Sequence, residues 1–537
     1  AFLIGKDPGD KNGDPVSLVP PPECQDRFWA WLATQTPEVR ARYANGFKDA
    51  RMMVIGNLYG RRTAPNIYRG EFEQIVTKDP RICKTFEFLR GHRDACVYTC
   101  RKTGASLYHH VDDFNVTADD PELDELYEAM ALRVPLKQSK NLIAGTKVAL
   151  LGSTKIRTAD AIYTLPDDKH CQNILKALGM ENCKPSAVPS KQLVEDEAGI
   201  VELQGEYFST YQQCTGSGIY LSRGRRDVQF AIKELARMIH APRQCDWTNL
   251  MIFARYLQGT RLYATRTQLN AESQGRLSKV TLDCYNDSDH AGCRRTRRST
   301  TGEVGVVGGA VVESTSQTQP GLPALSVGEG ETRATSHGCS TVMYLQKLVE
   351  EDFRMECTKP RLWTDSGSTK QGLERLGVGK IRHLDTQHLF VQEAQRLKLM
   401  TLGKVKGTEN PSNVLTKHLK SGQEMRDALP GLDIVDLSEQ GLKQLLDDAK
   451  ELKVSGVSAT ASGKTGAAKR PTPWKCPLPN RITAGSVIML GCLLGAATGE
   501  RAEKETVENA DWNCFWFICL YVVMHLGHDT IVIGKVL

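Results

Sequence analysis

The chain has 537 residues, with 69 Lys and Arg against 63 Asp and Glu and a formal net charge of +6. This length suits two or three domains, each large enough for its own core. The 16 cysteines follow no regular framework, which argues against a secreted disulfide scaffold. So mild a charge does not establish nucleic acid binding, and the chemistry has to be inferred from local motifs.

The first such motif contains a pair of aspartates, Asp112 and Asp113. The segment 108–116 that carries them predicts two short strands joined by a tight turn. Aspartate suits a turn, and paired aspartates suit the metal site of a polymerase. A Val-Asp-Asp tripeptide is common by chance, so the neighbouring segments must decide its meaning.

Residues 200–265 predict a helical connection. Asp227 is expected to cap a first helix, and Gly259 to end a second one. Each helix carries one apolar stripe, which we interpret as core packing: Val228, Ile232, Leu235 and Ile239 in the first, and Trp247, Leu250, Met251, Ala254 and Leu257 in the second. Basic runs at 223–226 and 294–298 suit either contact with nucleic acid or a solvated loop.

Three later acids form the most informative pattern. Strands are expected to end at Asp287 and Asp365, and a helix to open with Glu331. These elements would bring three carboxylates to one edge of a sheet, where their mutual repulsion has to be neutralised by cations. Two hard cations about 3.5–4 Å apart stabilise the attacking and leaving oxygens of a phosphodiester. The alternative, three unrelated surface acids, is disfavoured by the sequence around them.

That surrounding sequence, from 276 to 420, resembles the RNase H domain of copia-type retroelement polyproteins. The matching segments are Arg297-Arg298-Ser299-Thr300-Thr301-Gly302 and Val307-Gly308-Gly309-Ala310 for the second and third strands, Ala324-Leu325-Ser326 before the glutamate helix, Arg382-His383-Leu384-Asp385 before a helix with Phe390, Ala394 and Leu397 on one face, and the closing run from Asn410 to Lys417.

The resemblance implies Mg²⁺, with Mn²⁺ as a substitute, held by Asp287, Glu331 and Asp365. The family carries a fourth aspartate where this chain has Asn413. An amide is neutral, so the second cation is expected to be held more weakly. His383 is expected to assist product release or proton transfer, and an ordinary histidine at a helix start explains it equally well.

The upstream part resembles the family's reverse transcriptase. The matching segments are Asn57-Leu58-Tyr59-Gly60 with Ala64-Pro65, Leu150-Leu151-Gly152, and the run from Leu178 to Pro185. The resemblance makes Asp112 and Asp113 catalytic metal ligands and places Phe2, Thr63, Ala64 and Pro65 at the nucleotide site. His110 and Thr63 replace the family's Tyr and Gln. Ala1-Phe2-Leu3 looks like the tail of the first palm motif, whose essential Asp lies four residues before that Ala, so we expect no polymerase activity from the chain as given.

The expected fold class is a multidomain α/β and α+β protein. Its parts are a truncated reverse transcriptase palm and thumb region (1–190), a helical connection (191–275), an RNase H-like mixed sheet with flanking helices (276–420), a helix with a low-complexity linker (421–480) and a poorly ordered hydrophobic tail (481–537). Leu432, Ile434, Leu437 and residues 442–446 indicate the helix, and the uncharged runs 482–499 and 512–526 suit either a membrane hairpin or a host-derived or out-of-frame fusion.

Two functions remain from different classes. One is the C-terminal remnant of a copia-type Pol that cleaves RNA in RNA–DNA hybrids. The other is a catalytically dead nucleic-acid-binding or membrane-tethered protein. The expected partners are an RNA–DNA hybrid and a primer–template, together with a membrane if the runs within 482–526 form a hairpin. By family the chain is expected in cytoplasmic particles or in the nucleus.

Overall fold

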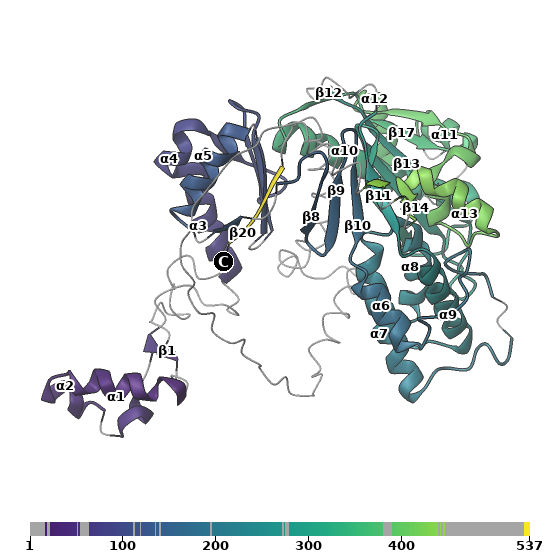
Figure 1. The fold of residues 1–537 in the computed structure, drawn as a ribbon. Coiled ribbons are helices and arrows are strands. Elements are labelled where there is room, and N and C mark those ends of the chain that lie inside the picture. Colours follow the sequence, from purple (N-terminus) through teal and green to yellow (C-terminus); the bar gives the residue numbers. More distant parts are fainter. Residues whose placement is uncertain are drawn as a thin grey trace. The chain divides into compact units, whose positions relative to one another are not determined.

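A computed structural model of the chain describes residues 17–18, 22–43, 45–50, 52–53, 64–110, 113–118, 120–134, 136–138, 141–193, 196–270, 273, 279–377, 379, 389–438, 441, 444–445 and 531–536. The chain divides into two compact units. Unit 1 comprises 1–143, 347–356 and 527–537, and unit 2 comprises 144–346 and 357–526. The described part is a mixed α/β chain with several sheets, in keeping with the expected multidomain class (Figure 1).

Unit 1 is built on a six-stranded sheet in the order β3-β4-β5-β6-β20-β7. Helices α3, α4 and α5 pack on the sheet because their apolar residues recur at helical spacing, such as Tyr68, Phe72 and Ile75 in α3. The main elements are α3 (Ala64–Lys78), α4 (Pro80–Thr85), β3 (Phe88–Arg90), β4 (Val97–Cys100), β5 (Ser106–His110), β6 (Asp113–Thr117), α5 (Asp120–Ala131), β7 (Leu136–Gln138), the π-helical turn η4 (Leu348–Asp352) and β20 (Ile531–Val536). Short elements precede them: β1 (Ser17–Leu18), η1 (Pro22–Cys24), α1 (Gln25–Ala33), α2 (Pro37–Ala41), η2 (Gly46–Asp49) and β2 (Met52–Met53).

The two strands expected around the aspartate pair are confirmed. Strands β5 and β6 are antiparallel, and His110 pairs with Asp113, whereas the expected turn at 111 and 112 lies outside the described residues. On its other side β6 pairs with β20, a strand from the far end of the sequence. Strand β20 in turn pairs with β7, so it lies inside the sheet.

Unit 2 begins with an antiparallel sheet in the order β19-β11-β10-β9-β8. Its strands are β8 (Thr146–Leu150), β9 (Ser153–Arg157), β10 (Ile162–Pro166), β11 (Tyr263–Thr267) and β19 (Ile434–Asp436). The β8–β9 turn holds Leu151 and Gly152 at φ of 45° and 65°. Positive φ at both central residues is typical of a tight hairpin turn, and glycine adopts it readily.

Four helices follow the first strands: α6 (Lys169–Ala177), α7 (Gly205–Ser222), α8 (Gln229–Arg237, after the short turn η3, Arg226–Val228) and α9 (Gln244–Gly259). Both predicted apolar stripes face the core, with Val228, Ile232 and Leu257 among the buried residues. Helix α9 ends at Gly259 as expected. Helix α7 lies within the predicted helical connection at 200–265, although no apolar stripe marked it there.

The second sheet of unit 2 has the order β15-β14-β13-β17-β18. Strands β13 (Leu282–Ser288), β14 (Thr300–Val307) and β15 (Ala310–Thr318) are antiparallel, whereas β17 (Arg361–Thr364) and β18 (Thr401–Lys404) run parallel to β13. The remaining elements are α10 (Val327–Lys347), α11 (Gly367–Leu373), α12 (Phe390–Arg396), η6 (Gly407–Glu409), η7 (Pro411–Leu415), α13 (Gly422–Ala428), η8 (Leu429–Leu432), and the two-residue strands β12 (Lys279–Val280) and β16 (Glu356–Cys357).

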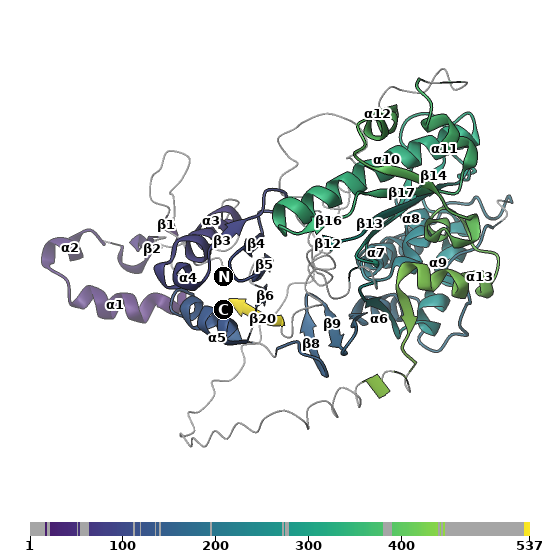
Figure 2. The same ribbon diagram turned by 90° about the horizontal axis from the view of Figure 1, so that it is seen from above.

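This second sheet lies between α10 and the helices α8 and α9 (Figure 2). Alternation along β14 explains the arrangement. Val304 belongs to the core that the connection helices share, whereas a Cβ on the next residue, Gly305, would lie 3.1 Å from Leu345 of α10.

Three sequence expectations were wrong in detail. Asp227 does not cap α8, because its carboxylate accepts hydrogen bonds from the buried Arg225 and from Tyr256. Leu397 does not extend the buried face of α12; it follows the end of this short helix and is 52% exposed. The segment 434–436 is strand β19 and not a helix, because it pairs with β11.

Candidate metal centre

Two neighbouring parallel strands bring Asp287 and Asp365 together. The register of β13 and β17 pairs Asn286 with Thr364, so the residues that follow them, Asp287 and Asp365, stand side by side where the strands end. Parallel strands place their carboxyl ends at the same edge of a sheet. This is the arrangement that the two strand-like segments predicted.

The third carboxylate comes from the first turns of α10. Asp287, Glu331 and Asp365 each contribute an oxygen, and these atoms all lie within 4.8 Å of one another. Asp287 and Glu331 are buried, and Asp365 is half-buried. The close approach of α10 depends on Gly330, where a Cβ would lie 3.0 Å from the Ser288 hydroxyl.

Burial and the neighbouring negative charges shift Glu331 and Asp365 toward their protonated forms. Burial, together with the charges of Asp287 and Asp365, raises the pKa of Glu331 to about 8, while Lys417 opposes this rise. Burial also raises the pKa of Asp365, with a second contribution from Asp287. A cation among the three groups would reverse these shifts because it stabilises the ionised carboxylates.

The residues present fit a hard divalent cation. One carboxylate oxygen of Glu331 is buried and has no hydrogen-bond partner among the described residues. Oxygens on opposite sides of a Mg²⁺ ion are about 4.2 Å apart, twice the Mg–O distance, which is close to the observed spread. Carboxylate oxygens are ligands that suit Mg²⁺ and Mn²⁺.

Residues around the cluster hold it in position. Thr416 donates a hydrogen bond of 2.6 Å to Oδ2 of Asp287. Asn410 donates to the backbone oxygen of Asn286, and Gln319 donates to Ser288, Thr301 and the backbone oxygen of Gly330. The closing run 410–417 contained Asn410, Thr416 and Lys417 but gave no sign of their separate roles, and no motif marked Gln319.

Asn413 is engaged elsewhere. It lies in η7, where its side-chain nitrogen donates to the backbone oxygen of Gly407 and its oxygen accepts a hydrogen bond of 2.9 Å from Lys417. No hydrogen bond among the described residues joins Asn413 to the three acids.

The other predicted site residues fall in unit 1 or outside the described residues. Asp113 begins β6 and is half-buried, and Pro65 is exposed in the first turn of α3. Ala64 begins α3, but its side chain is not described. Phe2, Thr63, Asp112, His383 and the apolar runs 482–499 and 512–526 lie outside the described residues. In the described part, no helix combines the length and apolar character that crossing a membrane requires.

The fold and the carboxylate cluster define a mixed α/β chain with a candidate metal centre. The chain is similar to proteins of transposons. Over 380 residues it is 24% identical to the "Retrovirus-related Pol polyprotein from transposon TNT 1-94" of Nicotiana tabacum, covering 67% of this chain and 26% of that protein. It is 22% identical over 369 residues to the "Retrovirus-related Pol polyprotein from transposon RE2" of Arabidopsis thaliana, covering 67% and 24%. An uncharacterized mitochondrial protein of Arabidopsis thaliana is 28% identical over 180 residues, 34% of this chain and 71% of that protein.

The resemblance to Pol polyproteins of copia-type transposons is thus confirmed over two thirds of the chain, at low identity. The chain spans about a quarter of the length of these polyproteins. No protein-family model matches it.

Proposed function

We propose that the second sheet of unit 2 and its helices form an RNase H-like domain that cleaves the RNA strand of RNA–DNA hybrids with Mg²⁺ or Mn²⁺. The observation that carries the proposal is the meeting of Asp287, Glu331 and Asp365 within 4.8 Å at the carboxyl ends of parallel strands. The ordered series of motifs around these acids and the Pol polyproteins among the relatives support it.

Each residue has a role that follows from its position. Asp287, Glu331 and Asp365 would hold the cations, which supply an activated water and charge stabilisation at the phosphodiester. Thr416 fixes the orientation of Asp287 through its hydrogen bond. Lys417 moderates the negative charge, since it lowers the pKa of both Glu331 and Asp365. Asn413 contributes no charge, which favours a weakly held second cation.

The test uses the full chain and a hybrid labelled on its RNA strand. We expect slow RNA cleavage with Mg²⁺ or Mn²⁺ and none in EDTA. Asp287→Asn and Asp365→Asn should each abolish cleavage while the protein stays folded. Glu374→Gln is a matched control, because Glu374 is an exposed acid of the same unit, paired with Lys370 and outside the cluster.

A hybrid that is bound but left intact by the wild-type chain and by Asn413→Asp, with bound metal shown by titration, would overturn the nuclease proposal. The chain would then be a non-catalytic nucleic-acid-binding protein. The departure at Asn413 is the observation that favours this second function.

For unit 1 we propose that the β5–β6 hairpin is the counterpart of a reverse transcriptase palm turn. Asp113 at the start of β6 supports this assignment. The test is template-directed extension of a primer by the full chain. Extension that is lost in Asp113→Asn would show polymerase activity.

A further inference from the structure

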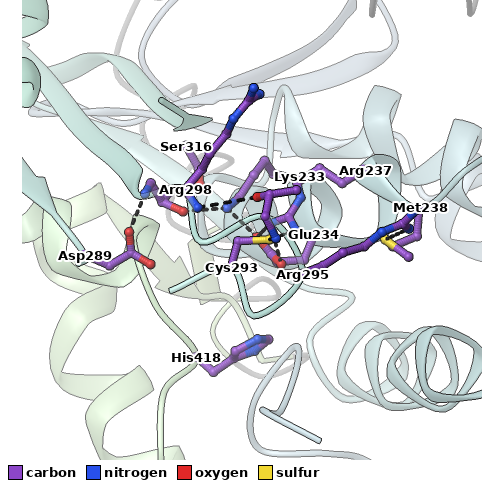
Figure 3. Close-up of polar contacts among 12 residues, drawn as sticks. Lys233, Glu234, Arg237, Met238, Asp289, Cys293, Arg295, Arg298, Ser316 and His418 are labelled. Atoms are coloured by element: carbon purple, nitrogen blue, oxygen red, sulfur yellow. Dashed lines mark hydrogen bonds and ion pairs between the residues drawn. The ribbon is translucent and has the colours of Figure 1, made fainter. Parts of the chain in front are cut away.

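A cavity of about 90 Å³ lies in unit 2, away from the three acids. Helix α8, the start of α9, the segment 190–193, the loop 292–295 and His418 line it. A single water needs only about 10–15 Å³ of such space, so the cavity has room for a small polyatomic ion and some water. Figure 3 shows Arg237, Cys293, Arg295 and His418 from these different segments close together.

The lining carries an excess of positive charge. Five cationic side chains contribute to it, namely Lys191, Arg237, Arg243, Arg294 and Arg295, against the two carboxylates of Glu234 and Asp246. Both carboxylates are already engaged, Glu234 with Lys233 and Arg237, and Asp246 with the backbone N–H of Arg243. Burial lowers the pKa of His418 to about 4, so this ring is neutral at pH 7 and does not add to the charge.

Two arginines at the cavity donate hydrogen bonds to neutral acceptors. Arg295 donates to the thioether sulfur of Met238 at 3.7 Å, and Arg294 donates to the backbone oxygen of Leu193 at 3.2 Å. A thioether is a weak acceptor, so an oxyanion would be a better partner for that guanidinium.

The positive charge at the cavity also affects the thiol of Cys293. Arg237 donates to its sulfur at 2.5 Å. Burial pushes the pKa of the Cys293 thiol upward, but hydrogen bonds from Thr296 and the charge of Arg237 outweigh it and lower the pKa. The cavity therefore already favours a negative charge over a neutral group.

We propose that this cavity binds a phosphoryl group, and that in the working protein this group is a backbone phosphate of the nucleic acid whose strand enters the carboxylate cluster. The inference rests on the proposed nuclease function for the identity of the ligand, but not for the binding of the anion. Arginine forks match phosphate oxygens in geometry and charge, which makes this lining suited to a phosphate.

Two segments connect the cavity to the acids. The loop that carries Cys293, Arg294 and Arg295 leaves β13 directly after Asp287 and Ser288. His418 follows Thr416, the residue that donates to Asp287, by two positions. A phosphate held in the cavity would thus fix the strand at a defined distance from the metal centre.

The first experiment uses inorganic phosphate and the full chain. The rate at which iodoacetamide alkylates Cys293 is followed by peptide mass spectrometry. This rate reports on the cavity because Cys293 lines it and the thiolate is the form that reacts. At about twice the dissociation constant, phosphate should slow this reaction about threefold relative to chloride at equal ionic strength. Cys183, half-buried in the same unit and outside the lining, provides an internal control.

The second experiment replaces phosphate by an RNA–DNA hybrid in EDTA. In the double variant Arg294→Gln, Arg295→Gln, the hybrid should no longer protect Cys293. The slope of log K against log salt should become less steep by about one unit. The matched control is Arg297→Gln with Arg298→Gln, which removes the same charge from the same loop outside the lining. It should keep the protection.

The outcomes separate the possible sources of the anion. Protection by both phosphate and hybrid supports the proposal. Protection by phosphate alone overturns the assignment to nucleic acid, and protection by neither overturns the site itself. Cleavage of the hybrid without protection of Cys293 would leave the proposed nuclease standing while this inference fails.

Discussion

The hydroxyl of Thr416 donates a 2.6 Å hydrogen bond to Oδ2 of Asp287, and both residues are buried. Thr416 is itself fixed by the turn η7, since its backbone N–H donates to the backbone oxygen of Asn413. The turn packs so closely on β14 that a Cβ at Gly302 would lie 2.6 Å from the oxygen of Ser412. The closing segment thereby sets the orientation of one acid of the candidate centre.

Replacing this hydroxyl should weaken metal binding. In Thr416→Val the volume is kept and the hydrogen bond is lost, so we expect the affinity for Mg²⁺ or Mn²⁺ to fall about 10- to 100-fold. Thr416→Ser keeps the hydroxyl and should stay near wild type. The affinity is measured by adding metal and recording the rise in the thermal unfolding temperature. Equal affinities in the Val and Ser variants would contradict the prediction.

Asn413→Asp should lower the Mg²⁺ concentration needed for half-maximal hybrid cleavage and raise the rate. The physical reason is that a carboxylate at this position would hold the second cation more strongly than the neutral amide does. The gain should stay modest because Lys417, which already donates to the Asn413 side chain at 2.9 Å, will pair with the new acid. Asn413→Ala adds no charge and serves as the control. A gain of the same size in both variants would exclude a charge effect.

Metal binding at neutral pH should release a proton from Glu331. Its pKa in the folded, metal-free chain is about 8 against an ordinary 4.5, so between these values the folded state binds more protons than the unfolded state. The stability of the metal-free chain therefore falls as pH rises through this window, and a cation favours the ionised form.

Calorimetric Mg²⁺ titrations at pH 7 in buffers of different ionisation enthalpy measure this release. Glu331→Gln has no proton to lose and should show no dependence on the buffer. Stabilisation by Mg²⁺ should also be larger at pH 8 than at pH 6. Wild-type heats that are the same in every buffer would disprove the linkage.

The buried pair of Arg225 and Asp227 should be required for stability. Two hydrogen bonds of 2.9 and 2.6 Å join them, and both side chains are at most 4% exposed. Asp227→Asn would leave the guanidinium without a charge partner, which costs about 3–5 kcal/mol. Glu393→Gln removes an exposed ion pair of the same unit and should leave the denaturant midpoint unchanged. Equal midpoints for the two variants would rule out the predicted cost.

Local sequence patterns were sufficient to predict features that lie within one helix or one hairpin. The hairpin at 106–117, the stripes of α8 and α9, and the stop at Gly259 follow from turn chemistry and periodicity. The acids at 287, 331 and 365 could be brought together because each lies at the end of a recognisable strand or near the start of a helix.

Tertiary pairing explains what sequence reasoning missed. Asp227 looks like a helix cap in the sequence, but its carboxylate accepts hydrogen bonds from the buried Arg225. Ile434 looks helical beside Leu432 and Leu437, but Asp433 adopts φ of 56° and the chain then pairs with β11. The phosphate-sized cavity joins segments from residue 190 to residue 418, and no local window contains that information.

Strand β20 has a consequence for how the protein is made. It lies between β6 and β7, yet it begins 393 residues after β7 ends, at 531 against 138. During synthesis the sheet of unit 1 must remain open while the ribosome translates all of unit 2, whose own elements can fold meanwhile. Strands β6 and β7 would expose unpaired backbone edges throughout that interval, so the nascent chain should need chaperone protection at unit 1 more than at unit 2.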